Sequence, residues 1–233
     1  MRAVVTLYAV IAYLLFLAAS AWAAVFLAGD MDTGRPAALG VAVTVNVALL
    51  ALFAVQHTVM ARAGFKRRLA RVLPESAERA TFVVASALAL LLLFAAWRPM
   101  PSAVWTVPRP WSIALWIAYA AGWLLVVAST FMIDHWDFLG LRQAYQRPYA
   151  EPPFRERWLY VWVRHPMMLG LLIAFWATPN MTEGHLLFAV ASSAYIAVGI
   201  RFEERDLRRR LGEPYGEYAA RVRALVPVRR NAA

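Results

Sequence analysis

The sequence predicts an all-α, polytopic transmembrane helical bundle of five to six spans with a cytoplasmic, amphipathic C-terminal helix. Three observations support this fold class. The 233 residues are 62% hydrophobic with a mean hydropathy of +0.54, which is more apolar than a soluble domain. Apolar runs near the length of about 20 residues that crosses a bilayer recur along the chain. Basic residues gather at the ends of these runs.

Six apolar runs lie between charged segments and are the candidate spans. They cover residues near 4–27, 38–61, 80–97, 111–133, 166–178 and 184–200. The fifth run is short, so the number of spans stays at five or six. The first run resembles a signal peptide because Ala21-Trp22-Ala23 mimics a cleavage site. Its apolar core exceeds the usual length of about 7–15 residues, and we therefore expect a retained helix.

The positions of Lys and Arg predict that both chain ends face the cytoplasm, because positively charged short loops stay on that side. The connection between the second and third runs is strongly basic. It carries Arg62, Lys66, Arg67, Arg68, Arg71 and Arg79. A second Arg-rich stretch begins at Arg201.

The formal net charge is +10 and the chain has no cysteine. The basic residues border apolar runs and form no separate domain, so they favour contact with anionic lipid and not with nucleic acid. The missing cysteines exclude a disulfide, a thiolate metal site and a cysteine nucleophile supplied by the protein. With no fixed-period repeat or linker, we expect one integral-membrane domain over residues 1–233.

Two segments outside the apolar runs are candidates for function. The connection over residues 134–164 is long and rich in polar and aromatic side chains, which is typical of functional loops. After Arg201 the pattern predicts a charged helix, a break at Gly212 and Pro214, and a second helix of roughly helical apolar spacing. We expect that last helix to lie on the membrane face.

The fifth run opens with Arg164-His165-Pro166, and proline suits the first position of a helix. The N–H groups of a helix start attract a carboxylate or another polar ligand group. The sixth run ends at Glu203-Glu204, where two acids repel one another and face the negative end of a helix dipole. If the two runs form an antiparallel hairpin, His165 and Glu203 share one edge, where a cofactor could bridge them.

A purely structural alternative stays open for the same residues. Arg164 and Arg201 would then be cytoplasmic anchors. The two acids would pair with Arg205, with Arg208 or with the basic segment 62–71.

Several motifs in order resemble the C-terminal signature of the isoprenylcysteine carboxyl methyltransferase superfamily of integral-membrane methyltransferases. These motifs are Arg164-His165-Pro166-x-x-x-Gly170, Glu203-Glu204, Gly212-x-x-Tyr215-x-x-Tyr218 and Val226-Pro227. They lie within residues 160–228, and loop contributors extend the cofactor-binding signature to about 143–228. The resemblance implies S-adenosyl-L-methionine as methyl donor, with S-adenosyl-L-homocysteine as product, bound near the cytoplasmic surface.

By the same resemblance, eight residues would contact this cofactor. They are Gln143, Tyr160, His165, Pro166, Met167, Met168, Glu203 and Glu204. The family often has tyrosine where this chain has Met168, so that aromatic or hydroxyl contact is missing or supplied elsewhere.

Two further strings resemble the bacterial methanethiol S-methyltransferase branch of the superfamily. They are Gln56-His57-x-x-Met60-x-Arg62 and Asp134-His135-Trp136-Asp137, the latter followed by Phe138-Leu139-Gly140-Leu141-Arg142-Gln143. The resemblance implies methyl transfer to a small thiol, from methanethiol to dimethyl sulfide, in the bacterial inner membrane. Thiols are largely protonated at neutral pH, so a base should assist. His57 and His135 are the candidates for it, Gln56 and Arg201 for substrate binding, and no metal ligands are expected.

Other functions stay open from the sequence. Another methyltransferase of the superfamily would act on a prenylated thiol, a carboxylate or a lipid. A haem or metal protein would use two of His57, His135, His165 and His185. A denitrification-associated protein would keep the cofactor fold without activity. The sequence does not indicate the oligomeric state.

Overall fold

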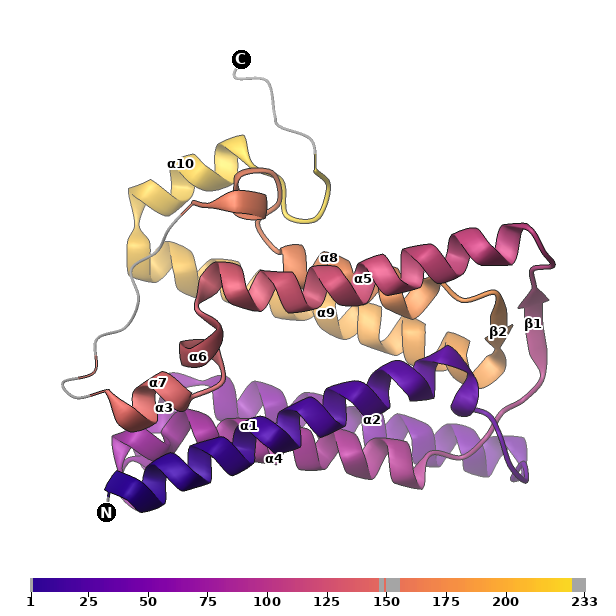
Figure 1. Ribbon diagram of the computed structural model, residues 1–233, viewed down its shortest axis with the longest axis horizontal. Helices are drawn as coiled ribbons and strands as arrows, with labels where there is room; N and C mark the ends of the chain where they lie inside the picture. The colour runs from indigo at the N-terminus through magenta and orange to yellow at the C-terminus, as the bar shows by residue number, and fades with distance from the viewer. Residues whose placement is uncertain (1, 147–148, 150–155, 228–233) are drawn as a thin grey trace. The chain divides into compact units, whose positions relative to one another are not determined.

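The computed structural model describes residues 2–146, 149 and 156–227, and most of them are helical. The long helices are labelled in Figure 1. In chain order the elements are α1 (Arg2–Val25), η1 (Phe26–Asp30), α2 (Leu39–Ala61), α3 (Ala63–Leu69), α4 (Glu75–Ala96), β1 (Ala103–Thr106), α5 (Trp111–Ile133), α6 (His135–Phe138), α7 (Leu141–Tyr145), η2 (Trp158–Val161), α8 (Pro166–Trp176), β2 (Asn180–Thr182), α9 (Glu183–Leu211) and α10 (Glu213–Arg221). The two short strands form a two-stranded sheet.

Five of the described helices are long and apolar enough to cross a membrane, which confirms the predicted polytopic bundle. They are α1 with η1, α2, α4, α5 and α9. The fifth apolar run forms only the 11-residue helix α8. At about 1.5 Å per residue, α8 is about 16 Å long, too short to cross a hydrocarbon core of about 30 Å.

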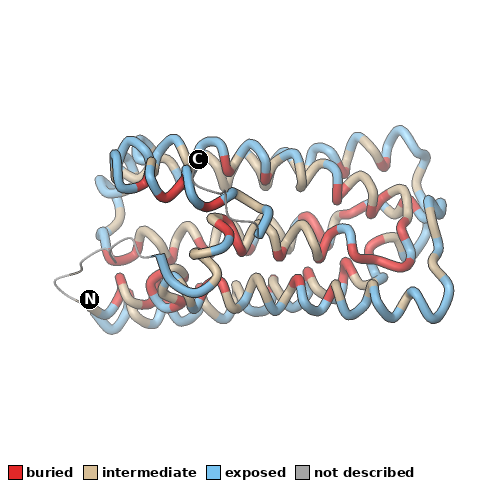
Figure 2. Tube along the Cα trace, turned by 90° about the horizontal axis from the view of Figure 1, so that it is seen from above, coloured by how far each residue is buried: buried red, intermediate tan, exposed pale blue. Residues whose placement is uncertain are grey.

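The surface of these helices is apolar, as expected for a bundle that has lipid as its solvent. Only 11% of the most apolar stretch of α2 is buried. Figure 2 shows exposed positions along the whole length of the long helices. Val55, Ile117 and Leu124 keep 61–69% of their surface exposed. An apolar surface of this extent needs a hydrocarbon environment.

The chain divides into two compact units. Unit 1 consists of residues 1–104, 134–152 and 180–186, and unit 2 of residues 105–133, 153–179 and 187–233. In unit 1, α1 packs against α4, and α2 packs against the other side of α4. Ala9, Ala12 and Ala80 are fully buried in this core. Small side chains let the helix backbones approach closely where lipid provides no hydrophobic drive for association.

Two polar side chains, the half-buried Asp32 and the buried Asn46, hold the connection that follows α4 in unit 1. Asp32 accepts hydrogen bonds from Trp97 Nε1 at 3.2 Å, from the Met100 N–H at 2.8 Å and from the Thr182 hydroxyl. Asn46, which is fully buried, both accepts from the Arg98 N–H and donates to the Arg98 carbonyl. In the connection that follows α4, the N–H and carbonyl of Arg98 and the N–H of Met100 are therefore satisfied by side chains of other segments.

In unit 2, α5 and α8 cross at a point where both carry glycine. A Cβ added at Gly170 would lie 2.7 Å from the Gly122 carbonyl oxygen and 2.9 Å from the Val126 nitrogen. The crossing therefore requires glycine at both positions. At the other end of the unit, Gly212 adopts a left-handed φ of 66° and ends α9. A short helix follows this break, as the sequence predicts, and its position on the membrane face stays a prediction.

The close crossing predicts that Gly170→Ala destabilises the protein. The added methyl would meet backbone atoms, which move only if a helix shifts, at a cost of about 1–3 kcal/mol. Thermal unfolding in detergent should show a lower Tm. Gly199→Ala is the control, because among the described residues no atom beyond the adjacent backbone of its own helix lies within 4 Å of the added methyl. Equal Tm values for the two variants would show that the crossing tolerates a side chain.

Candidate functional site

The start of α8 is held in place by the C-terminal segment of the chain. Pro166 occupies the first helical position and His165 the position before it. The N–H groups of Arg164 and His165 donate to the carbonyls of Arg223 and Ala224, each at 3.0 Å. Among the described residues, no side chain caps this helix start. Its first-turn N–H groups, those of Met167 and Met168, therefore lack an acceptor within the helix.

An ion pair joins the start of α8 to the end of α9. The Nε and Nη2 atoms of Arg164 lie 2.8 and 2.5 Å from one oxygen, Oε1, of Glu204. The remaining nitrogen, Nη1, donates to the carbonyls of Ala219 and Val222. Both side chains are mostly buried, with 11% and 17% of their surface exposed. A buried pair of this kind holds only when further hydrogen bonds satisfy the guanidinium, as these carbonyls do.

His165 lies against both acids at the end of α9. Its Nε2 atom is 3.2 Å from Glu204 Oε1, and its Nδ1 atom is 3.5 Å from Glu203 Oε2. Burial lowers the pKa of the imidazole, but hydrogen bonds to the two carboxylates and their charges outweigh burial, and the pKa is raised. Glu203 keeps half of its side chain exposed, so its carboxylate is accessible to a ligand.

This geometry is the hairpin that the sequence predicts. His165 and Glu203 are 38 positions apart, and the structure brings their side chains within contact. The structural alternative had paired the acids with Arg205, with Arg208 or with segment 62–71. Glu204 instead pairs with Arg164, to which the sequence assigned no role beyond a motif position or an anchor. The only signal in the sequence for this contact is that Arg164 directly precedes His165.

Three tyrosines pack around the same cluster. The Tyr218 hydroxyl donates to the Tyr160 carbonyl at 2.6 Å. The Tyr215 and Tyr218 rings meet edge to face and are buried with Leu207 and Leu211 of α9. Burial, followed by the charge of Glu204, raises the pKa of Tyr215 to about 12. These phenols therefore stay neutral and fix α10 to the end of α9.

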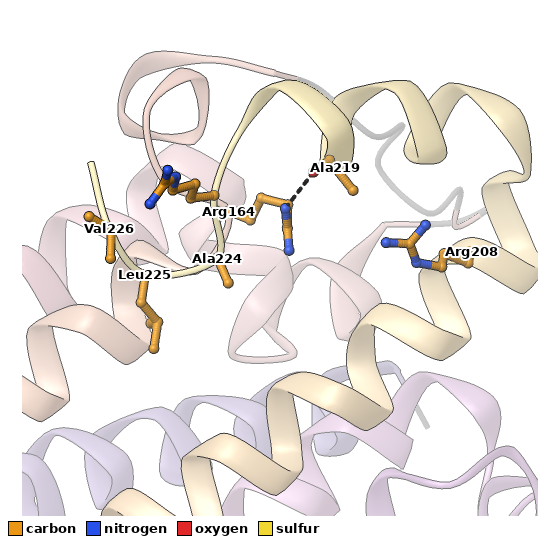
Figure 3. A pocket seen from close by; sticks show the side chains of 7 residues that line it. Arg164, Arg208, Ala219, Ala224, Leu225 and Val226 are labelled. Atoms are coloured by element: carbon orange, nitrogen blue, oxygen red, sulfur yellow. Dashed lines mark hydrogen bonds between the residues drawn. The ribbon is translucent and has the colours of Figure 1, made fainter. Parts of the chain in front are cut away.

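A pocket of about 530 Å³ opens beside this cluster. It is lined by Arg164, Arg208, Ala219, Arg223, Ala224, Leu225 and Val226. Figure 3 shows the pocket, with Arg208 of α9 on one side and Arg164 on another. Its volume lies in the range of small-molecule sites, about 300–1,000 Å³. Arg164 is already held by Glu204, so Arg208 and Arg223 are the arginines that give the apolar walls the character of an anion site.

The structure brings most of the predicted cofactor residues together in unit 2. His165, Pro166, Met167 and Met168 form the start of α8, while Glu203 and Glu204 lie near the end of α9. Tyr160 lies in η2, and burial, together with the charge of Glu203, raises its pKa. Arg201, predicted to bind substrate, lines a second pocket with Glu204.

The remaining predicted residues belong to unit 1. His57 Nδ1 lies 3.1 Å from the Ser86 hydroxyl oxygen, and Phe53 stacks on the imidazole. Gln56 Nε2 lies 3.1 Å from the Met60 sulfur. Ser86 is a contact that sequence reasoning missed, because it lies 29 positions from His57 on another helix.

His135 and Gln143 lie in the short helices α6 and α7. The Tyr13 hydroxyl is 3.2 Å from His135 Nε2. Burial lowers the pKa of His135, and the charge of Asp134 opposes this only in part. Gln143 Oε1 accepts from the Arg79 N–H at 3.1 Å. Gln143 thus fixes α7 to α4, and its predicted contact with the cofactor stays a prediction.

The comparisons with known proteins place the chain in one family of membrane proteins. Residues 45–226 match the family model described as NnrU protein. The chain is 48% identical to methanethiol S-methyltransferase of Mycobacterium tuberculosis over 97% of each chain. It is 47% identical to methanethiol S-methyltransferase 2 of Bradyrhizobium diazoefficiens over 97% of this chain and 91% of that protein. Nurim of Xenopus laevis is 28% identical over 70% and 61% of the two chains. No solved structure matches the chain.

These findings confirm the resemblance that the motifs predict. The relatives named as methyltransferases span nearly the whole chain, so the match extends beyond the C-terminal signature to the helices of unit 1.

The raised pKa of His165 predicts a pH-dependent contribution to stability. The protonated imidazole stabilises the folded state fully below its ordinary pKa of 6.5, and this contribution is lost as pH rises through the raised pKa. The Tm difference between the wild type and His165→Gln should therefore shrink as the pH rises above 6.5. The control is His135→Gln: because the pKa of His135 is lowered, its difference should grow as the pH rises toward 6.5 and stay constant above it. A pH-independent difference at His165 would contradict the assignment.

Proposed function

The chain belongs to the NnrU protein family, and on this premise we propose that it transfers a methyl group from S-adenosylmethionine to methanethiol and releases dimethyl sulfide. The observation that carries the proposal is the contact between the start of α8 and the end of α9, where His165 lies 3.5 Å from Glu203. Relatives that share this length and are named methanethiol S-methyltransferase support the choice of acceptor.

The residues at this contact fit the polar groups of S-adenosylmethionine. The cofactor carries a carboxylate, an ammonium group and ribose hydroxyls. The uncapped N–H groups of Met167 and Met168 and the arginine-lined pocket suit the carboxylate. The exposed half of Glu203 suits the ammonium or the hydroxyls. Tyr160 of η2, which precedes His165, and Pro166, which follows it, complete the proposed set of cofactor contacts.

When bound, the cofactor supplies a methyl group on a positively charged sulfonium. In the net reaction the carbon–sulfur bond to the donor breaks, a bond to the thiol sulfur forms, and the thiol proton leaves to a base. His165 is poorly suited as this base, because its two carboxylate neighbours favour the protonated ring. Its role in the proposal is to keep Glu203 and Glu204 in position.

His57 and His135 remain the proposed bases for the thiol. The lowered pKa of His135 leaves a neutral imidazole at physiological pH, which is the form that accepts a proton. For His57, the Ser86 hydroxyl fixes the orientation of the ring through Nδ1. We retain Gln56 and Arg201 as the proposed contacts for the thiol.

The protein is an integral membrane protein that acts on a small molecule. We further propose that both chain ends face the cytoplasm and that the membrane is the bacterial inner membrane. This orientation requires a sixth crossing beside the five long helices, which α8 and the extended residues 177–182 would make together, since β2 pairs with β1 at the side where α5 begins. The basic connection 62–79 and the Arg-rich end of α9 support this orientation. The charged cofactor would then come from the cytosol, and an apolar thiol from the bilayer.

The proposed role of Glu203 predicts that Glu203→Gln weakens cofactor binding. Loss of a hydrogen bond to a charged group, about 1.5–3 kcal/mol, corresponds to a loss of affinity of about 10-fold to 100-fold. Calorimetry with S-adenosylhomocysteine measures the affinity, and headspace detection of dimethyl sulfide measures turnover. Glu217→Gln, an exposed acid on α10, is the control. Unchanged affinity in Glu203→Gln would exclude this site, and turnover absent in the wild type would exclude methanethiol.

The contact between Ser86 and His57 predicts a smaller effect on turnover. Ser86→Ala removes one hydrogen bond of about 0.5–1.5 kcal/mol, so the rate should fall about 2-fold to 10-fold. Ser86→Thr keeps the hydroxyl and should restore most of the rate, while the affinity for S-adenosylhomocysteine stays unchanged in both. If Ser86→Ala and Ser86→Thr lose the same activity, the hydroxyl has no positioning role.

A further inference from the structure

The end of α9 carries a face of arginines that the proposed reaction does not use as a set. Arg201, Arg205, Arg208 and Arg209 follow one another at intervals of four, three and one residues. This spacing places them on one side of a helix. All four are exposed and, together with Glu204, line a pocket of about 450 Å³. We refer to these four residues as the α9 arginine face.

The charge of this face is not compensated within the described chain. Glu204 is the single acid that lines the pocket, and it is held by Arg164 and His165. Within residues 2–146, 149 and 156–227, no ion pair joins the α9 arginine face to a carboxylate. The C-terminal end of a helix favours positive charge, but only weakly. Four guanidinium groups along two turns still repel one another, and an anion between them would relieve this.

The position of the face along α9 indicates which anion it meets. α9 has 29 residues and is therefore about 43 Å long, whereas a hydrocarbon core of about 30 Å takes about 20 residues. The apolar part of the helix ends at Ile200, directly before Arg201. The α9 arginine face therefore follows the apolar segment at the depth where lipid headgroups present their phosphates.

We propose that the α9 arginine face binds the headgroup phosphate of an anionic phospholipid. The planar guanidinium group matches phosphate with two parallel hydrogen bonds. A zwitterionic headgroup carries the same phosphate, but its own cation cancels the attraction of the four arginines, so selectivity for anionic lipid follows. Glu203 and Glu204 lie between Arg201 and Arg205, so a bound lipid would brace the helix end that carries both acids.

Native mass spectrometry of the full chain in detergent tests this proposal. Phosphatidylglycerol and phosphatidylcholine with the same acyl chains are titrated, and the wild type should bind the first more tightly. Arg205→Gln and Arg209→Gln should each weaken phosphatidylglycerol binding about fivefold, the effect of about 1 kcal/mol per arginine near a membrane surface. Binding of phosphatidylcholine should not change. Circular dichroism verifies that each variant is folded. If Arg209→Gln is not folded, Arg209→Lys replaces it: it keeps the charge but loses the paired hydrogen bonds of the guanidinium group, so it should also weaken phosphatidylglycerol binding.

Arg210→Gln is the matched control, because it removes the same charge from the neighbouring position, which does not line the pocket. An equal loss in Arg210→Gln and Arg209→Gln would overturn the proposed site and leave only a general effect of charge. Equal affinity of the wild type for the two lipids would overturn it as well. Inorganic phosphate that displaces the lipid at equal concentration would show that a free anion, and not a headgroup, is the ligand.

Discussion

The ion pair between Arg164 and Glu204 is the contact on which the rest of the site depends. One guanidinium group joins the start of α8, the end of α9 and the carbonyls of Ala219 and Val222. Removal of one partner from a buried ion pair typically costs about 3–5 kcal/mol, because the other charge is left buried without a counterion. Without Arg164, the buried Glu204 carboxylate would depend on His165, 3.2 Å away, as its remaining cationic neighbour. The position of the imidazole and its contact with Glu203 therefore depend on the same pair.

The bilayer explains why the chemistry is confined to helix ends. Lipid accepts no unpaired polar backbone group, so the spans are long helices with apolar surfaces. α8 is the exception in length, since its 11 residues cannot cross the membrane. The uncapped start of α8 lies next to the charged end of α9, which places a polar site at the edge of an apolar fold. The arginines beyond Ile200 extend the same principle along α9.

The sequence predicted much of the fold, since apolar length and charge spacing determine where spans lie. It also predicted that His165 and Glu203 meet, because a hairpin of two adjacent segments is a local arrangement. It could not predict contacts that depend on which helices pack together. Neither the hydrogen bond of Ser86 with His57 nor that of Asp32 with Thr182 leaves a pattern in the sequence. Arg164 bonds both Glu204 and the carbonyls of Ala219 and Val222. The second contact depends on the path of the chain at the end of α10, which no periodic pattern in the sequence predicts.

In the proposed complex the uncapped start of α8 receives the cofactor. Hydrogen–deuterium exchange resolved to single amides tests it most directly, because the Met167 and Met168 N–H groups have no acceptor within their helix. We predict that S-adenosylhomocysteine slows exchange at these two amides, while the amides at the start of α4 are unaffected. Exchange at Met167 and Met168 that stays unchanged at saturating ligand would contradict the account.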